Sequence, residues 1–158
     1  MAEDSNERDT FGEELFEVLS KIINLAGFRA RVEWRKRGDN DYYINVRTRR
    51  SDGLLIGRAG ETLRSLQMIV TAILQRRYSR LPSTVVDVGG YKQRRENFLR
   101  KKAMAIAKIV LETGREMALD PLTDKERRLV EQALDEKPEI RYYTIGTGYR
   151  KNVIIAPR

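Results

Sequence analysis

The chain contains neither cysteine nor histidine among its 158 residues. Without cysteine, disulfide bonds and thiolate metal sites are excluded. Without histidine, the Ser-His, Cys-His and His-metal arrangements of many enzymes cannot be built, which leaves only carboxylate, lysine or tyrosine chemistry. These absences disfavour an enzyme, and no pattern in the chain indicates a metal site, a cofactor or a small-molecule substrate.

Long apolar runs are also missing. No segment approaches the length that spans a bilayer, and the start Met1 to Ser5 lacks the basic residues and apolar core of a secretory signal. We therefore expect a cytoplasmic protein without membrane insertion. Hydrophobic residues still make up 41% of the chain, enough for one ordinary domain or two small ones with packed cores.

Positive charge predominates in the sequence. The 31 lysines and arginines outnumber the 23 aspartates and glutamates, and the net charge is +8. Residues 1–19 contain seven acidic residues and one basic residue, Arg8, so this segment carries −6 and the remainder carries +14. We expect residues 1–10 to be an acidic, disordered lead, and we expect the basic remainder to favour a polyanionic partner.

Hydrophobic periodicity predicts a first module over residues 11–90. Its predicted elements are a helix over 11–25, strands over 28–37 and 42–48, a short helical turn over 54–56, a helix over 61–78 and a strand over 84–88. The buried stripe predicted for the helix over 61–78 comprises Leu63, Leu66, Ile69, Val70, Ile73 and Leu74. Gly89-Gly90 then forms the predicted domain boundary.

A second module is predicted over residues 91–158. It opens with a charged helix over 91–113, whose predicted apolar face runs from Phe98 to Leu111. Thr123 and Glu126 have the spacing of a capping box, which predicts the start of another helix. Strands are predicted over 140–145 and 152–156, joined by the glycine-rich segment 146–151.

The stretch Ile56-Gly57-Arg58-Ala59-Gly60 is the main candidate binding site. Two glycines three residues apart let the backbone turn tightly, and the helix that follows directs its unpaired N–H groups at the same place. Arg58 adds a positive charge, so the stretch suits a phosphate group. A Gly-x-x-Gly pair is equally able to serve as a plain turn or helix cap. If it binds phosphate, Gly57→Asp with Gly60→Asp is expected to abolish most binding and leave the fold intact, because a carboxylate would occupy the phosphate site.

Further candidate nucleic-acid-binding residues are basic or aromatic: Arg49, Arg50, Arg64, Tyr91, Arg94, Arg95, Arg127, Arg150 and Lys151. For the charged helix, the alternative interpretation is an ordinary solvated surface. For the segment 146–151, the alternative is a structural turn.

Several motifs, in this order, resemble the bacterial Jag family, the SpoIIIJ-associated or KhpB proteins, over residues 11–158. The motifs are Leu55–Leu63, Asp87–Tyr91, Arg94–Glu96 and Pro121–Arg128. The resemblance implies an α+β chain. It consists of a type II K-homology (KH) domain of order α-β-β-α-α-β over 11–90 and a small α/β R-three-H-like domain over 91–158.

The resemblance also implies a non-enzymatic protein that binds single-stranded RNA. KH loops clamp about four nucleotides of single strand, and Gly57 to Gly60 occupy that position. The implied role is post-transcriptional regulation linked to cell elongation, division, cell shape or cell wall. A binder of single-stranded DNA and an adaptor that pairs with a second KH protein remain as alternatives.

The chain departs from the family at two places. Arg127 occupies the arginine of the Arg-x-x-x-His motif, but Glu131 stands at the histidine position. Residues four apart share a helix face, so an ion pair between Arg127 and Glu131 is expected. Only about ten polar residues precede the first predicted helix, so functions of the family's separate N-terminal domain are not expected here.

Overall fold

The computed structural model describes residues 9–158. Residues 1–8 of the predicted acidic lead lie outside the described residues, whereas the side chain of Asp9 caps the first helix by accepting from the Gly12 amide. The chain divides into two compact units, one ending at Lys92 and the other comprising Gln93–Arg158. The predicted boundary after Gly90 lies close to this division, and the domain limits 11–90 and 91–158 stay a prediction.

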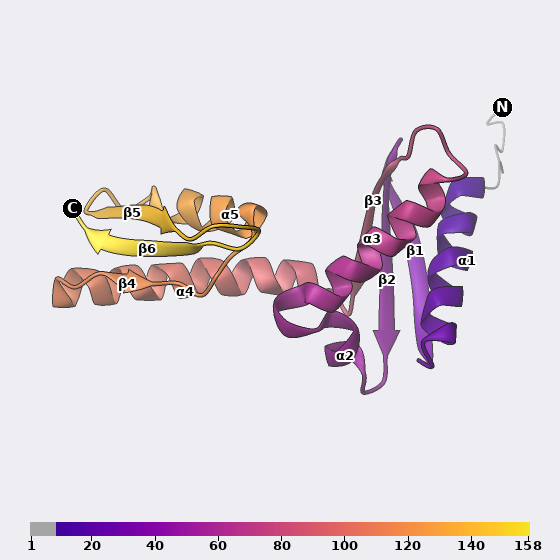
Figure 1. Ribbon diagram of the computed structural model, residues 1–158, viewed down its shortest axis with the longest axis horizontal. Coiled ribbons are helices and arrows are strands. Elements are labelled where there is room, and N and C mark those ends of the chain that lie inside the picture. The colour runs from indigo at the N-terminus through magenta and orange to yellow at the C-terminus, as the bar shows by residue number, and fades with distance from the viewer. Residues whose placement is uncertain (1–8) are drawn as a thin grey trace, which may run out of the picture. The chain divides into compact units, whose positions relative to one another are not determined.

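The first unit has the order α-β-β-α-α-β of a type II KH domain (Figure 1). Its elements are α1 (Thr10–Leu25), β1 (Ala30–Gly38), β2 (Asp41–Thr48), α2 (Asp52–Ile56), the 3-10 turn η1 (Arg58–Gly60), α3 (Glu61–Gln75) and β3 (Ser83–Val88). The sheet order is β1-β2-β3, with β1 antiparallel and β3 parallel to β2. A parallel pair needs a long crossover, which here contains α2, η1 and α3.

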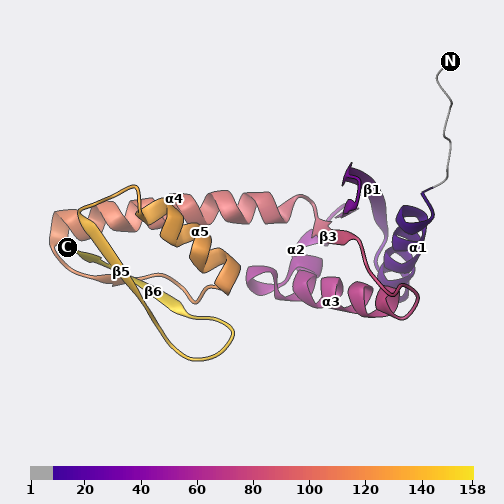
Figure 2. The same cartoon turned by 90° about the horizontal axis from the view of Figure 1, so that it is seen from above.

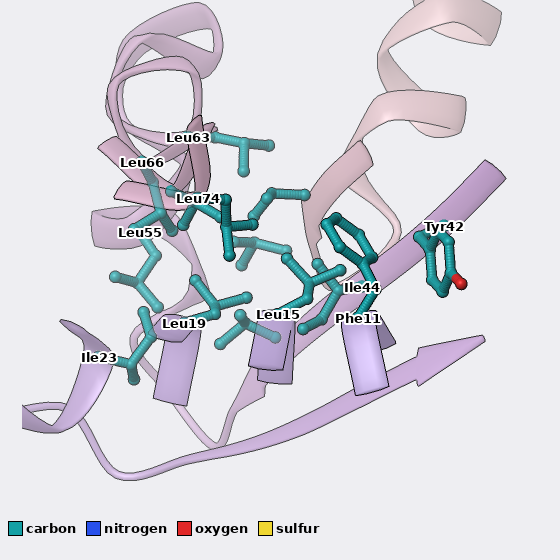
Figure 3. Close-up of a cluster of buried hydrophobic side chains, with 14 residues drawn as sticks. Phe11, Leu15, Leu19, Ile23, Tyr42, Ile44, Leu55, Leu63, Leu66 and Leu74 are labelled. Atoms are coloured by element: carbon teal, nitrogen blue, oxygen red, sulfur yellow. The ribbon is translucent and has the colours of Figure 1, made fainter. Parts of the chain in front are cut away.

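One face of this sheet carries the core of the first unit. Figure 2 shows α1 and α3 on the same side of the strands. On β2, Tyr42, Ile44 and Val46 alternate toward that side and are at most 4% exposed. They meet leucines of α1 and α3, such as Leu15 and Leu63, in one apolar cluster (Figure 3). Burial of side chains of this size stabilises a fold by about 1.5–3 kcal/mol each.

The predicted apolar stripes of the helices are partly wrong. Ile69 of α3 is 49% exposed, whereas its neighbour Val70 is fully buried. Ile69 is turned by about 100° from Val70 around the helix, away from the buried stripe of Leu63, Leu66, Val70 and Leu74. Leu25 at the end of α1 is 79% exposed, whereas Ile23 in the same turn is buried.

Tight packing of α1 on β1 depends on a residue without a side chain. A Cβ atom added at Gly12 would fall among the ring atoms of Trp34. The indole therefore lies directly against the backbone of α1.

The second unit is also α+β. Its elements are α4 (Tyr91–Thr113), which begins within the first unit, β4 (Met117–Ala118), α5 (Asp124–Leu134), β5 (Ile140–Ile145) and β6 (Asn152–Pro157). The sheet order is β4-β6-β5 and both pairings are antiparallel, so the predicted pairing of the last two strands is confirmed. Leu99, Val110 and Val130 join Val153 in its core, whereas Phe98 is 52% exposed, contrary to its predicted place on the apolar face.

The predicted capping box is present at the start of α5. The Thr123 hydroxyl accepts a hydrogen bond from the Glu126 amide, and the Glu126 carboxylate accepts one from the Thr123 amide at 2.9 Å. Both bonds are local in sequence, which is why spacing alone predicts them.

Candidate nucleic-acid interface

The segment 57–60 joins α2 to α3 through an unusual backbone. Gly57 has φ 72° and ψ −179°, Ala59 has φ 49° and ψ 31°, and Gly60 has φ 82° and ψ 15°. Three of four residues thus have positive φ, and the chain reverses between two helices within a single turn. Because Gly60 is the N-cap residue of α3, no capping side chain covers that end of the helix.

Glycine is required at both ends of this loop. A Cβ atom at Gly57 would collide with the Thr62 side chain and lie 2.8 Å from the Thr62 amide nitrogen. A Cβ atom at Gly60 would lie 2.9 Å from Cε1 of Tyr91. The expectation that aspartate at both positions leaves the fold intact is therefore wrong for the loop itself, since positive φ and these contacts both oppose any side chain.

Ala59 holds the least favourable backbone conformation of the loop. Among residues 9–158 it alone combines positive φ with a side chain. The left-handed region costs a residue other than glycine roughly 1–2 kcal/mol, and asparagine or aspartate adopts it more readily. Strain of this kind is concentrated at functional sites. The alanine keeps the loop surface small where a longer residue would cover the backbone.

The charge of the loop comes from Arg58. Its side chain is exposed. Within the part of the chain that the structure describes, no carboxylate forms an ion pair with it. A guanidinium in this position can turn toward an anion bound at the loop without first breaking a salt bridge.

Two polar side chains hold Tyr91 beside the loop. The Gly90 amide donates to Asn45 Oδ1 at 3.3 Å, and the Lys92 amide donates to Asp87 Oδ1, also at 3.3 Å. Asp87 is only 2% exposed and accepts further hydrogen bonds from the Val88 amide and the Tyr43 hydroxyl. The end of β3 is thereby fastened to β2, which positions the Tyr91 ring against Gly60.

The Tyr43 hydroxyl donates a hydrogen bond to Asp87 at 2.9 Å. Burial raises the pKa of Tyr43 to about 12, and its hydrogen bond to the negatively charged Asp87 acts in the same direction. The phenol therefore stays protonated and donates to Asp87 throughout the physiological pH range.

The predicted site residues of the first unit lie on consecutive pieces of this region: Arg49, Arg50, Ile56, Gly57, Arg58, Ala59, Gly60, Arg64 and Tyr91. Arg49 and Arg50 are exposed between β2 and α2, and Ile56 is the half-buried last residue of α2. Arg64 is exposed on α3, one turn after the loop. Contact between these residues and nucleic acid stays a prediction.

Two predicted site residues of the second unit are engaged in ion pairs. Nε of Arg95 donates to Glu126 Oε1 at 2.9 Å, and both side chains are less than one-fifth exposed. NH1 of Arg127 donates to Glu131 Oε1 at 2.6 Å, which confirms the expected pair on α5. This hydrogen bond and the charge of Glu131 raise the pKa of Arg127. A phosphate at Arg127 would have to approach a carboxylate as well.

The remaining predicted residues of the second unit are placed on α4 and before β6. Arg94 is exposed on α4. Arg150 and Lys151 are half-buried where the 146–151 segment meets β6, and the Lys151 backbone forms a bridge with Leu122 next to α5. The segment therefore has a structural role in the sheet, whether or not it also binds a ligand.

Sequence reasoning missed three residues that shape the loop region: Thr62, Asn45 and Asp87. Asp87 carried a usable signal, because a carboxylate amid the valines of a short buried strand needs hydrogen-bond donors. Asn45 and Thr62 carried none, since their roles depend on contacts between segments distant in sequence or on loop geometry.

Residues 9–158 contain no group of three or more acidic side chains arranged to hold a metal ion. In the same range, no helix combines the length and apolar character needed to cross a membrane.

Comparison with known proteins supports the resemblance to the Jag/KhpB family. RNA-binding protein KhpB of Clostridium symbiosum is 29% identical over 147 residues, which cover 92% of this chain and 63% of that protein. RNA-binding protein KhpB of Lactiplantibacillus plantarum is 30% identical over 67% of this chain and 33% of its own length. The Bacillus subtilis protein of the same name is 29% identical over 65% and 50%. No protein-family model matches the chain.

The similarity covers most of this chain but only part of each relative. The chain spans between about a third and 63% of the length of these three curated proteins. The resemblance to the Jag/KhpB family that the motifs indicated is confirmed, and it agrees with a KH domain followed by an R-three-H-like domain.

Proposed function

We propose that this chain is a non-enzymatic RNA-binding protein that holds single-stranded RNA at the loop 57–60. One observation carries the proposal: three residues with positive φ keep a side-chain-poor backbone turn at the start of α3, beside the exposed guanidinium of Arg58. A backbone with few side chains lets a phosphate approach closely, and the start of the helix adds a partial positive charge. The names of the similar proteins support RNA as the partner.

In this proposal the neighbouring residues extend the contact along the strand. Arg49, Arg50 and Arg64 add positive charge around the loop, and Tyr91 supplies an aromatic ring beside Gly60. Phosphate contacts position a strand, whereas stacking and base-edge contacts select its sequence. The loop therefore fixes the path of the RNA, and the residues around Tyr91 meet its bases.

We further propose that the protein acts in the cytoplasm as a post-transcriptional regulator linked to cell elongation and division. In the second unit, Arg94, Arg150 and Lys151 are the residues proposed to lengthen the footprint. Arg95 and Arg127 contribute less, since each already pairs with a glutamate. Crosslinking the protein in its own cells and sequencing the attached RNA would identify its targets; recovery of no RNA above background would reject this role.

The direct test is a binding titration by fluorescence anisotropy with a labelled single-stranded RNA. We expect affinity to fall steeply with salt, by a slope of about 0.7 for each phosphate contacted. Arg58→Gln should lower the salt slope by about 0.7, the value for one phosphate contact. Arg76→Gln removes an exposed charge elsewhere on the first unit and should leave the slope unchanged. A flat salt profile, or equal slopes for both variants, would reject the loop as the phosphate site.

The choice between RNA and DNA needs a separate competition experiment. Unlabelled RNA and DNA oligonucleotides of matched sequence should be added to the preformed complex. Only RNA offers 2′-hydroxyl groups, so we expect the RNA competitor to be more effective. Stronger competition by DNA would favour a single-stranded DNA binder instead.

A second candidate function is an adaptor that pairs with another KH protein. The observation in its favour is a set of exposed apolar side chains on α2 and α3, namely Leu54 at 69%, Met68 at 60% and Ile69 at 49%. Exposed apolar surface of this kind marks protein interfaces when it is contiguous. A stable protein complex in pull-downs without RNA, lost on Met68→Glu, would support this candidate.

A further inference from the structure

The face of the KH sheet opposite the core is rich in arginine. On β2, Tyr42, Ile44 and Val46 face the core, so Tyr43, Asn45 and Arg47 face away from it. Register places Arg31 opposite Arg47 and Arg35 opposite Tyr43 on this outer face. The guanidinium of Arg37 also lies on it, 5.3 Å from the centre of the Tyr43 ring.

The arginines continue beyond the strands at one end of the hairpin, where the start of β1 pairs with the end of β2. A surface hollow is lined by Arg29, Arg31, Arg47 and Arg49, together with Ala30 and Thr48. A second hollow shares Arg47 with the first and is also lined by Glu33, Trp34, Arg35, Tyr43, Asn45 and Gly90. We call the resulting set, Arg29, Arg31, Arg35, Arg37, Arg47 and Arg49, the hairpin arginines.

Most of these charges are not neutralised. Arg31 pairs with Glu33 at 2.6 Å, and Arg37 pairs with Asp41 at 3.1 Å. For the other four hairpin arginines, no carboxylate within residues 9–158 forms an ion pair. The third carboxylate on this face belongs to Asp87, which is buried and accepts hydrogen bonds from the Tyr43 hydroxyl and the Val88 amide.

This arrangement costs stability. Like charges directly across a strand pair are destabilising, and Arg31 stands directly opposite Arg47. Glu33 and Asp41 offset two of the arginines on this face, but arginine remains in excess over carboxylates. A pair of like charges that opposes folding in this way is more common at functional sites than elsewhere in a structure.

The spacing of the charges suits a phosphate chain. Residues two apart on one strand face lie about 6.6 Å apart, and neighbouring strands are separated by about 4.8 Å. The first of these distances is comparable to that between successive phosphates of a nucleic-acid strand. Guanidinium groups bind phosphate oxygens well and also stack on aromatic rings. The guanidinium carbon of Arg35 already lies 5.0 Å from the centre of the Tyr43 ring.

We propose that the hairpin arginines form a second contact surface for the phosphates of the same single-stranded nucleic acid, distinct from the loop 57–60. This inference rests on the proposed function of the loop and extends it. The two surfaces are connected within the first unit, because Gly90 lines the second hollow and the next residue, Tyr91, lies against Gly60. A strand longer than the loop can hold would therefore continue over the outer face of the sheet.

The experiment compares two lengths of single-stranded RNA on the parent protein and a set of variants. The short RNA has about four nucleotides, enough for the loop, and the long one has about 16. The test variant is Arg29→Gln with Arg47→Gln, and the control is Arg76→Gln with Arg80→Gln, which removes equal charge from exposed positions of the same unit. All proteins should first be compared by thermal melting.

We expect the test variant to bind the long RNA roughly tenfold more weakly at low salt, with a salt slope smaller by about 1.4. Its binding of the short RNA should equal that of the parent, and the control should behave as the parent with both lengths. Arg29→Lys with Arg47→Lys should keep most of the slope, because the charge is retained. Retention would also show that the loss does not come from misfolding.

Three results would overturn the inference. The first is equal binding of the long RNA by the test and control variants, and the second is equal loss with the short RNA. The third is a change of oligomeric state in size-exclusion chromatography in place of a change in RNA binding, which would make this face a protein interface. Short-RNA binding that still responds to Arg58→Gln would leave the proposed function standing in each case.

Discussion

Ala59 offers the sharpest test of the loop, because its conformation accepts two side chains that differ only in charge. With φ 49° and ψ 31°, it lies in the left-handed region, which asparagine and aspartate tolerate better than other residues with a side chain. Ala59→Asn and Ala59→Asp should therefore both keep the loop. They add nearly the same volume, and only aspartate brings a negative charge to the place where we expect a phosphate.

The size of the effect follows from Coulomb's law. A carboxylate about 5 Å from a phosphate is repelled by roughly 1 kcal/mol in bulk water and by roughly 3 kcal/mol at the effective dielectric constant of a protein surface. This range corresponds to a loss of affinity of about 5-fold to 200-fold. The new carboxylate in Ala59→Asp would also attract the Arg58 guanidinium, so the loss of affinity should lie toward the upper end of this range. Ala59→Asn should stay within about twofold of the parent.

The assay is an anisotropy titration of the short RNA with the parent and both variants at one fixed, low salt concentration. Thermal melting of each protein shows whether the fold is kept. Equal affinities of Ala59→Asp and Ala59→Asn, with both proteins folded, would refute a phosphate at this loop. A loss for both variants would show that side-chain volume matters more than charge, and that too would contradict the electrostatic argument.

Three further predictions concern the second unit and the packing of the first. Glu131→Gln should raise RNA affinity about 2- to 5-fold, because it releases Arg127 from its ion pair. The control Glu136→Gln removes an exposed carboxylate of the same unit and should have a smaller effect. An anisotropy titration compares the RNA affinities of the two variants. Burial raises the pKa of Glu126, but the Thr123 amide and Arg95 lower it more, so its folded-state pKa lies below the ordinary 4.5. The resulting stability is present above 4.5 and is lost as pH falls through the lowered pKa, so Glu126→Gln should show a shallower loss in acid melting curves. Gly12→Ala should destabilise the first unit by about 1–3 kcal/mol through its collision with Trp34, and an unchanged melting midpoint would contradict that packing.

Local patterns predicted the parts of this structure that local forces determine. Thr123 and Glu126 form their capping box because both bonds lie within one helical turn. Arg127 and Glu131 meet because four residues span one turn. The order of helices and strands was likewise predictable, since the apolar spacing changes from that of a helix to that of a strand along the chain.

Features that depend on contacts between distant segments were not predictable. The burial of Asp87 requires Tyr43, a partner 44 residues away. The burial of Val70 in place of Ile69 requires the position of the sheet, which the helix alone does not specify. The outer face of the hairpin is an intermediate case, because the alternation of arginines was visible but not the opposition of Arg31 and Arg47. That opposition follows only from the strand register.

The two proposed contact surfaces should differ in what they contribute to binding. The loop 57–60 brings one exposed arginine and a strained backbone, so it contributes geometry and few charges. The hairpin arginines bring six positive charges on and beside β1 and β2, and four of them form no ion pair with a carboxylate of residues 9–158, so they contribute affinity with little selectivity. High salt should therefore weaken the hairpin contacts first, because screening acts most strongly on exposed charges. A long RNA should therefore lose its advantage over a short one as salt rises.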